Sequence, residues 1–215
     1  MKPKILKPTQ ENISLMGEQI AKGEVVCFKT DTIYGLAANP FSDDAVKKIF
    51  EAKQRPEDKP IILLASQNFD IESIAVLTEK EKEIVNKFWP APLTIIFNLK
   101  PNHGLSKFVT CGQNIIAIRK PADALSNVLA LQAGGLITST SANISGNEVK
   151  NNAQDIQKEF ENTSLKFILD GGKTQDITSS TLIKIENEQI KILRQGNFKV
   201  WWKSNFFCLI FYYFF

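Results

Sequence analysis

Apolar and polar residues follow one another along this chain with two different periods, which predict both helices and strands. Apolar residues at helical spacing, each series opened by a capping residue, predict helices after Thr9, Ser42, Thr78 and Asn152 and a fifth around Leu125. Short apolar runs predict strands at 24–28, 61–65, 93–99, 115–119 and 136–140, a strand and turn within 166–172, and a closing hairpin formed by 180–185 and 190–194.

The order of these elements favours one fold class. Helices and strands interleave, but some consecutive strands have no helix between them, which a purely parallel sheet would require. We therefore expect an α/β protein with a single domain, in which an open, twisted, mixed sheet has flanking helices. No internal repeat or linker precedes residue 198, so residues 1–197 are expected to form the domain.

Residues 198–215 form an aromatic C-terminal tail that differs in composition from the rest. It ends in ten consecutive apolar residues, 206–215, whereas a helix needs about 20 to span a bilayer. The tail either packs on the domain or is an aberrant end of the reading frame; a tail that touches a membrane or a partner is the alternative. The first residues lack the apolar stretch of a secretion signal.

Composition narrows the possible functions. A net charge of +3 is too small to argue for nucleic acid by itself, so a basic surface must come from local clustering, best seen between Lys47 and Lys59. Three widely spaced cysteines indicate reduced thiols and a cytoplasmic protein. With His103 as its only histidine, the chain is poorly supplied for a Ser-His-Asp triad or a histidine-rich metal site.

Four loops rich in small polar residues carry the chemistry that remains. They are KTDTIYG (29–35), VTCG (109–112), STSANISG (139–146) and TSSTLI (178–183). Together with Lys53, Arg55, Lys59, Arg119 and Arg194 they suggest an anion site without a protein base. Phosphoryl or nucleotidyl transfer suits such a site, because it depends on positioning and charge neutralisation. The GGKT segment lacks the first glycine of a phosphate loop, and no metal-ligand spacing occurs.

Lys53 occupies an unusual place in this pattern. It closes the apolar face that Val46, Ile49 and Phe50 form on the second predicted helix. The lysine stem could cover the core while its ammonium reaches water, and Arg55 and Lys59 could lie in a solvated loop. The alternative is that an anionic ligand is the partner of Lys53.

Several segments together resemble the YrdC/TsaC family, the threonylcarbamoyl-AMP synthases. They are KTDTIYGLAANPFSDDAVKKIFEAKQRPEDKPI, WPAPLTIIF, IAIRKP, GGLITSTSANISG and ILRQG, and they extend from about Lys29 to Gly196. The resemblance implies a twisted mixed sheet with a concave basic face. It also implies a nucleotidyltransferase that joins L-threonine, bicarbonate and ATP into threonylcarbamoyl-AMP and releases pyrophosphate, for the modification of tRNA beside the anticodon.

The same resemblance implies roles for individual residues. Lys53 and Arg55 in KQRP would be catalytic and hold the ATP phosphates; Lys59, Thr110, Ser141, Asn143 and Arg194 would also bind ATP. Thr32 would contact threonine, with Tyr34 and Ser180 near it, and Arg119 in IAIRKP is a further candidate. Mg²⁺ would arrive with ATP, held mainly by phosphate oxygens, with no protein metal site.

Partners and rival functions follow from this interpretation. Other proteins would transfer the threonylcarbamoyl group onward, tRNA binding is possible, and no membrane contact is expected unless the tail makes one. One rival is a non-catalytic module that binds tRNA or double-stranded RNA. A second is the related carbamoyl-transferring domain of hydrogenase-maturation proteins, whose zinc-finger-like and acylphosphatase-like regions the sequence does not show. A third is an inactive paralogue kept for assembly.

Overall fold

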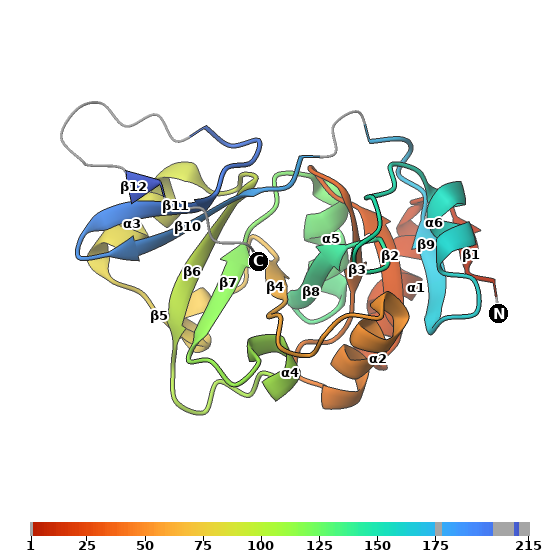
Figure 1. Ribbon diagram of the computed structural model, residues 1–215, viewed down its shortest axis with the longest axis horizontal. Helices are drawn as coiled ribbons and strands as arrows, with labels where there is room; N and C mark the ends of the chain where they lie inside the picture. Colours follow the sequence, from red (N-terminus) through yellow and green to blue (C-terminus); the bar gives the residue numbers. More distant parts are fainter. Residues whose placement is uncertain (1, 175–177, 200–208, 211–215) are drawn as a thin grey trace.

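In the computed structural model, which describes residues 2–174, 178–199 and 209–210, the chain forms one mixed, twisted sheet of twelve strands with helices against it (Figure 1). The strands are β1 Lys4–Leu6, β2 Val25–Lys29, β3 Tyr34–Ala37, β4 Ile62–Ala65, β5 Ala75–Val76, β6 Leu93–Leu99, β7 Ile115–Arg119, β8 Leu136–Ser141, β9 Leu165–Leu169, β10 Thr181–Glu186, β11 Gln189–Arg194 and β12 Leu209–Ile210. The helices are α1 Gln10–Ala21, α2 Asp43–Lys53, α3 Glu79–Phe88, α4 Lys107–Thr110, α5 Ala124–Gln132 and α6 Ala153–Glu159, with a 3₁₀ turn, η1 Ile71–Ser73.

The strand order confirms the mixed α/β sheet that the sequence predicts. It runs β1-β9-β2-β3-β8-β4-β7-β6-β10-β11-β12, and β5 pairs with β6 outside this path. The sheet contains both parallel pairs, such as β4 with β7, and antiparallel pairs, such as β3 with β8. The centre of the sheet therefore collects strands from distant parts of the chain, and the loops that follow them can meet over one face.

The helix starts confirm the capping residues read from the sequence. The side chains of Thr9, Ser42, Thr78 and Asn152 each accept a hydrogen bond from a backbone N–H in the first turn of their helix. At α3, Glu81 completes a capping box with Thr78. These bonds satisfy donors that a helix leaves free at its start, so the helices begin where the sequence predicts.

Two predicted loops are shorter than expected. Lys29 ends β2, and Tyr34 and Gly35 belong to β3, so only residues 30–33 form the loop of an antiparallel β2–β3 hairpin. In the segment VTCG, Val109 and Thr110 end the short helix α4. Polar composition predicted loops here, but pairing of β2 with β3 decides where the hairpin loop ends.

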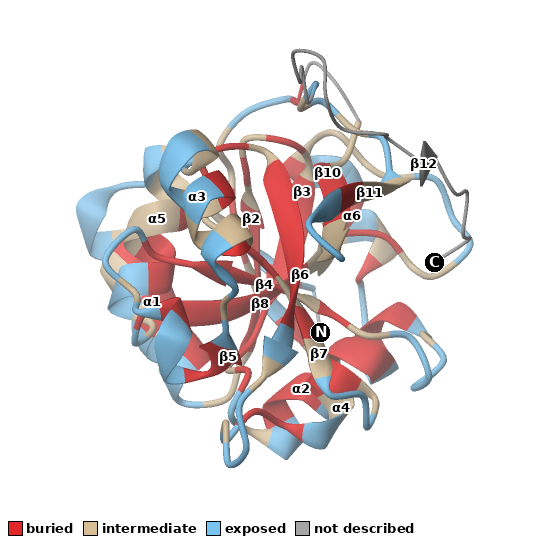
Figure 2. Ribbon diagram, turned by 90° about the vertical axis from the view of Figure 1, so that its left-hand side faces the viewer, coloured by how far each residue is buried: buried red, intermediate tan, exposed pale blue. Residues whose placement is uncertain are grey.

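Apolar side chains pack on both faces of the sheet. Val26 and Phe28 of β2 pack with residues of α1 and α5, whereas Val25 and Cys27 belong to the cluster that includes α2 and α6. The alternation is the period of a strand covered on two sides. Figure 2 shows the buried strands at the middle and the exposed outer sides of the helices.

None of the helices in the described ranges has the length and apolar character needed to cross a bilayer. Most of the predicted aromatic tail, 200–208 and 211–215, lies outside the described residues. Strand β12 within it pairs in parallel with β11.

Candidate active site

A cavity of about 370 Å³ opens over the central strands, a size suited to a small-molecule ligand. It is lined by Gly35 of β3, Ile62 of β4, Ile96 of β6, residues 115–117 and 119 of β7, Ser139, Thr140 and Ser141 of β8, Leu182 of β10 and Arg194 of β11. Loop residues Thr30, Thr32, Ile33, Arg55, Pro60, Ile61, Gln113, Val149, Ser179 and Ser180 complete the lining. Apolar side chains of the strands thus form its walls, and hydroxyl groups and arginines supply its polar groups.

The charge of this cavity is positive. Among the described residues that line it are three arginines, Arg55, Arg119 and Arg194, and no acidic residue. Burial lowers the pKa of both Arg55 and Arg194, and Arg119 lowers that of Arg194 further by repulsion. Because guanidinium groups keep their proton in proteins, the cavity suits an anionic ligand.

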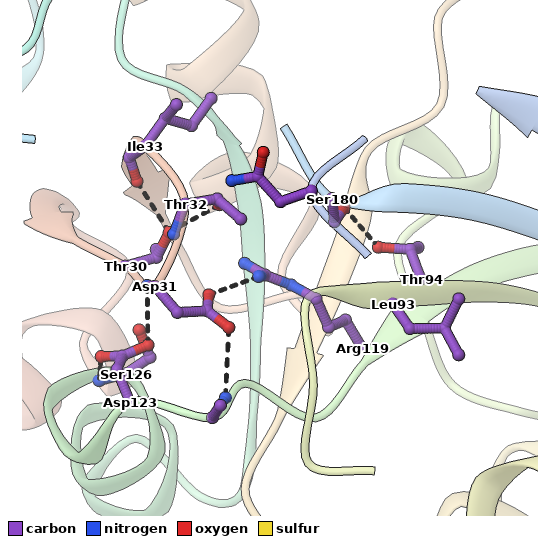
Figure 3. Close-up of polar contacts among 12 residues, drawn as sticks. Thr30, Asp31, Thr32, Ile33, Leu93, Thr94, Arg119, Asp123, Ser126 and Ser180 are labelled. Atoms are coloured by element: carbon purple, nitrogen blue, oxygen red, sulfur yellow. Dashed lines mark hydrogen bonds and ion pairs between the residues drawn. The ribbon is translucent and has the colours of Figure 1, made fainter. Parts of the chain in front are cut away.

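Arg119 is held at the cavity by the hairpin loop 30–33 (Figure 3). Its side chain, 2% exposed, forms an ion pair with the Asp31 carboxylate, which also accepts the backbone N–H of Ala122 at 3.2 Å. The Asp31 N–H in turn donates to Asp123 at 2.9 Å. Arg119 Nε is buried and has no hydrogen-bond partner within the described part of the chain.

Hydroxyl groups border Arg119 on two sides (Figure 3). The Thr32 and Thr30 hydroxyls lie 2.9 Å apart, and Thr30 Oγ1 donates to the Ile33 carbonyl at 2.7 Å, which fixes the narrow hairpin loop. On the other side Ser180 Oγ lies 2.7 Å from Thr94 Oγ1. Arg194 reaches the Ser180 carbonyl through Nε at 3.2 Å and Nη2 at 3.1 Å. The site is therefore preorganised by bonds within the hairpin loop and by bonds that join Ser180, just before β10, to β6 and β11.

Arg55 enters the cavity because α2 ends in a left-handed turn. Gln54 has φ of 49°, and the Arg55 N–H donates to the Phe50 carbonyl at 2.9 Å. The following proline disfavours helical geometry at Arg55, so the chain leaves the helix here. The Arg55 Nη2 group donates to the carbonyls of Lys59 at 3.3 Å and Pro60 at 3.0 Å.

Lys53 is buried, with 1% of its surface exposed, and its ammonium has protein partners. Its Nζ donates to the carbonyl oxygens of Ser141 and of Asn143, the latter at 2.6 Å. The idea that its ammonium escapes to water is therefore wrong, and its contacts in the structure are carbonyls. One of its three N–H donors is not used in these bonds; a phosphate contact for it stays a prediction.

The other predicted residues divide into two groups. Thr32, Arg55, Ser141, Ser180 and Arg194 line the cavity, whereas Lys53, Lys59, Thr110, Asn143 and Tyr34 do not. Lys59 is exposed, Thr110 is buried at the end of α4, and Asn143 is buried beside Ser141. Sequence reasoning brought together residues from four distant loops, but it could not rank their distances from the cavity.

Tyr34 has a different environment from the one expected beside a substrate. It is fully buried, and its hydroxyl donates to Asp170 at 3.2 Å and to the Gly172 carbonyl at 2.9 Å. Burial and the neighbouring Asp170 carboxylate raise the pKa of this phenol. Tyr34 therefore joins β3 to the loop after β9.

Five polar lining residues were not named as site residues from the sequence: Thr30, Gln113, Ser139, Thr140 and Ser179. Four of them lie in the polar loops that the sequence singled out. Alternation along β8 could have indicated one of the pair Ser139 and Thr140. Gln113 carried no signal, because a single polar residue after a turn is ordinary.

The stability of the folded protein should rise with pH through Lys53. Burial, and to a lesser degree Arg55, lower its pKa in the folded chain from 10.5 to about 7. Between these values the unfolded chain keeps a proton that the folded chain has lost, so the free energy of unfolding rises with pH in that interval. Below about 7 both states are charged, and the cost of burying the charge is present in full.

A Lys53→Met variant lacks this titration. Measured by urea unfolding between pH 6 and pH 9.5, the wild type should gain stability relative to Lys53→Met as pH rises. The comparison cancels the other titrating groups. A difference that stays constant with pH would contradict the lowered pKa.

Comparisons with known proteins give this cavity a context. Residues 18–196 match the Sua5/YciO/YrdC family, which is described as telomere recombination. A putative threonylcarbamoyl-AMP synthase of Methanocaldococcus jannaschii is 34% identical over 203 residues, which cover 91% of this chain and 94% of that protein. The threonylcarbamoyl-AMP synthase of Bacillus subtilis is 36% identical over 195 residues, which cover 89% of this chain and 55% of that protein.

A solved structure has the same fold at similar identity. Sua5 of Pyrococcus abyssi in complex with L-threonine matches with a TM-score of 0.81 and 31% identity, over 91% of this chain and 57% of that one. The chain thus spans nearly all of the Methanocaldococcus relative and little more than half of the Bacillus and Pyrococcus proteins.

Proposed function

The chain belongs to the Sua5/YciO/YrdC family, and from that membership we propose that it joins L-threonine, bicarbonate and ATP into threonylcarbamoyl-AMP and releases pyrophosphate. The observation that carries the proposal is the cavity itself. It combines three arginines with hydroxyl groups from separate loops and has no acidic residue among the described residues that line it. Such a cavity can neutralise phosphate and carboxylate groups, which this reaction needs more than it needs a nucleophilic side chain.

The substrates would occupy different parts of the cavity. Threonine would lie between the hairpin loop and Ser180, where its hydroxyl and carboxylate meet Thr32, Ser180 and the guanidinium of Arg119. ATP would take the part near Arg55, Ser141 and Arg194, with Lys53 behind Ser141. Lys59, Thr110 and Asn143 remain predicted ATP contacts, and Tyr34 a predicted neighbour of threonine, although none of the four lines the cavity.

The reaction follows from the substrates' own chemistry. The threonine amine attacks the carbon of carbon dioxide or bicarbonate, forming a carbamate and releasing a proton or water. A carbamate oxygen then attacks the α-phosphorus in line, and the bond from this phosphorus to the bridging oxygen breaks as pyrophosphate leaves. Arg55, Arg194 and Lys53 would offset the negative charge that builds up on the phosphate oxygens.

Magnesium is part of the proposed substrate, as the ATP complex. No group of three or more His, Cys, Asp or Glu side chains that could hold a metal occurs in the described ranges. In this proposal the ion would be bound mainly through phosphate oxygens and water, as Mg²⁺ often is with nucleotides.

Several finer points belong to the same proposal. The product would pass to separate threonylcarbamoyl transferases for modification of tRNA, and the reaction would take place in the cytoplasm. Residues 1–197 would form the catalytic domain, and 198–215 a tail outside it. Arg194, the last residue of β11, lines the cavity.

The direct test is pyrophosphate release from MgATP by the purified protein, with threonine and bicarbonate each left out in turn. We expect release that needs both, together with an adenylate product that contains threonine. Serine, which lacks the methyl group, and alanine, which lacks both the methyl group and the hydroxyl, serve as controls for the substrate.

Release that is absent, or independent of threonine, would contradict the proposal. If the folded protein then binds RNA in a way that weakens steeply with salt, the function is the RNA-binding module instead.

A further inference from the structure

Loop 141–147, which connects β8 to the segment before α6, is held to α2 by Lys53. The ammonium of Lys53 binds the carbonyls of Ser141 and Asn143, and the backbone carbonyl of Lys53 accepts the Ser145 N–H at 2.8 Å. Three bonds therefore join one residue of α2 to a loop almost ninety positions later. Ser141 at the start of this loop lines the cavity.

The other side of the same loop is held by Glu159, the last residue of α6. Its Oε1 accepts the Ile144 N–H at 3.1 Å and the Asn147 side-chain amide at 2.8 Å. The Glu159 side chain is only 8% exposed, and Lys150 Nζ lies 3.8 Å from Oε2. Lys53 thus donates to carbonyl groups of the loop, and Glu159 accepts hydrogen bonds from N–H groups of the loop.

We propose that Glu159 is a positioning residue of the active site, which together with Lys53 fixes loop 141–147 and so sets the place of Ser141 in the ATP part of the cavity. The inference rests on the proposed function, because it assigns a part in ATP binding to a residue outside the cavity. Glu159 touches no substrate in this proposal and acts only through the loop.

The location of Glu159 is unfavourable for a carboxylate unless the carboxylate has a structural role. A carboxylate in the last turn of a helix faces the negative end of the helix dipole, which disfavours it. Its burial adds a desolvation cost, which the two hydrogen bonds to Oε1 offset in part; Oε2 is buried without a hydrogen-bond partner among the described residues. The bonds to Glu159 also use the Ile144 N–H. The N–H of Ala142 donates to the Tyr34 carbonyl, and the N–H of Ser145 donates to the Lys53 carbonyl. With these donors used internally, the loop would contact a ligand mainly through side chains such as Ser141.

Glu159 and Lys53 are also coupled by charge. Burial and Arg55 lower the pKa of Lys53 to about 7, whereas Glu159, from α6, and Cys27, from β2, raise it. Removing the Glu159 charge should therefore lower the pKa of Lys53 further. Since a protonated amine is the stronger donor to the loop carbonyls, the bonds that fix the loop would weaken at a lower pH.

Three variants separate the hydrogen bonds from the charge. Glu159→Ala removes both; Glu159→Gln keeps an oxygen that can accept from Ile144 and Asn147 but removes the charge. Glu161→Gln is the matched control, because Glu161 is exposed and lies two residues further on. The measurements are the KM for ATP and for threonine with pH profiles, the Kd of a non-hydrolysable ATP analogue, and hydrogen exchange at the Ile144 amide.

We expect Glu159→Ala to raise the KM for ATP and the analogue Kd by about tenfold, the scale of a displaced contact group, with the KM for threonine changed much less. The Ile144 amide should exchange faster in this variant. In Glu159→Gln near pH 6.5, the protection of the Ile144 amide from hydrogen exchange and the affinity for ATP should largely return to the wild-type values. The alkaline limb of kcat/KM for ATP should still lie at lower pH than in the wild type, and Glu161→Gln should match the wild type.

The inference is overturned if Glu159→Ala folds and binds the ATP analogue as the wild type does, or if ATP and threonine affinities fall equally. If Glu159→Ala does not fold, Glu159→Gln is the deciding variant. An alkaline limb of kcat/KM for ATP at the same pH as in the wild type then overturns the coupling to Lys53. A wild type that binds the analogue but releases no threonine-dependent pyrophosphate contradicts the proposed function alone, and the binding and exchange measurements still test Glu159.

Discussion

Replacing Lys53 by alanine is expected to reduce kcat/KM for ATP in threonine-dependent pyrophosphate release by about a hundredfold or more, as the loss of a charge-stabilising group does elsewhere. Two effects combine. The variant loses a cation beside the ATP part of the cavity, and it frees the carbonyls of Ser141 and Asn143 that the ammonium binds. Loop 141–147 then loses its connection to the end of α2, apart from the Ser145 bond.

Two further variants make this result specific. Lys53→Met keeps most of the side-chain volume and removes the charge, so a folded but inactive Lys53→Met separates electrostatics from packing. Lys47→Ala, on the exposed side of the same helix, should keep near-normal activity and controls for helix stability. Activity of Lys53→Met within about threefold of the wild type, well below the expected loss, would show that the charge is not required.

Replacing Asp31 by alanine is expected to lower the free energy of unfolding by about 3–5 kcal/mol, the cost of leaving a buried charge without its partner. Arg119 is 2% exposed, and Asp31 is its only partner for an ion pair in the described residues. The Ala122 N–H loses its acceptor as well. Urea unfolding measures the loss, and the KM for threonine should rise because Arg119 is no longer held at the cavity.

A double replacement tests the cause. Asp31→Leu combined with Arg119→Met removes both charges, and it should recover much of the lost stability while the KM for threonine stays raised. Asp44→Ala is a control, since Asp44 is exposed in the first turn of α2. A loss below about 1 kcal/mol in Asp31→Ala, an ordinary value for a point mutation, would contradict a structural role for this ion pair.

Local signals were enough for the elements and for part of the site. Capping residues such as Ser42 and Thr78 act within three residues, and the apolar face of α2 repeats at helical spacing, so both are readable in one stretch of sequence. The resemblance of whole segments then placed Thr32, Ser141 and Arg194 at one site, and all three line the cavity. Their roles toward substrates stay predictions.

Contacts between distant residues were not readable in this way. The sequence indicated that Lys53 needs a partner, but the Ser141 and Asn143 carbonyls became that partner because β8 ends beside the end of α2. The Asp31–Arg119 pair and the bonds of Glu159 to Ile144 and Asn147 arise in the same manner. Backbone carbonyls and N–H groups also leave no trace in residue type.

By itself, then, the sequence determined where helices begin and which faces are apolar, because these depend on neighbours a few residues apart. It also predicted an anion-binding set of loops. Only the tertiary structure decided which strands lie side by side, and with them the partners of Lys53, Asp31, Tyr34 and Glu159. The physical reason is that strand order joins β2 to β9 and β4 to β8 across seventy or more residues of intervening chain. Periodicity gives each strand its faces but not its neighbours.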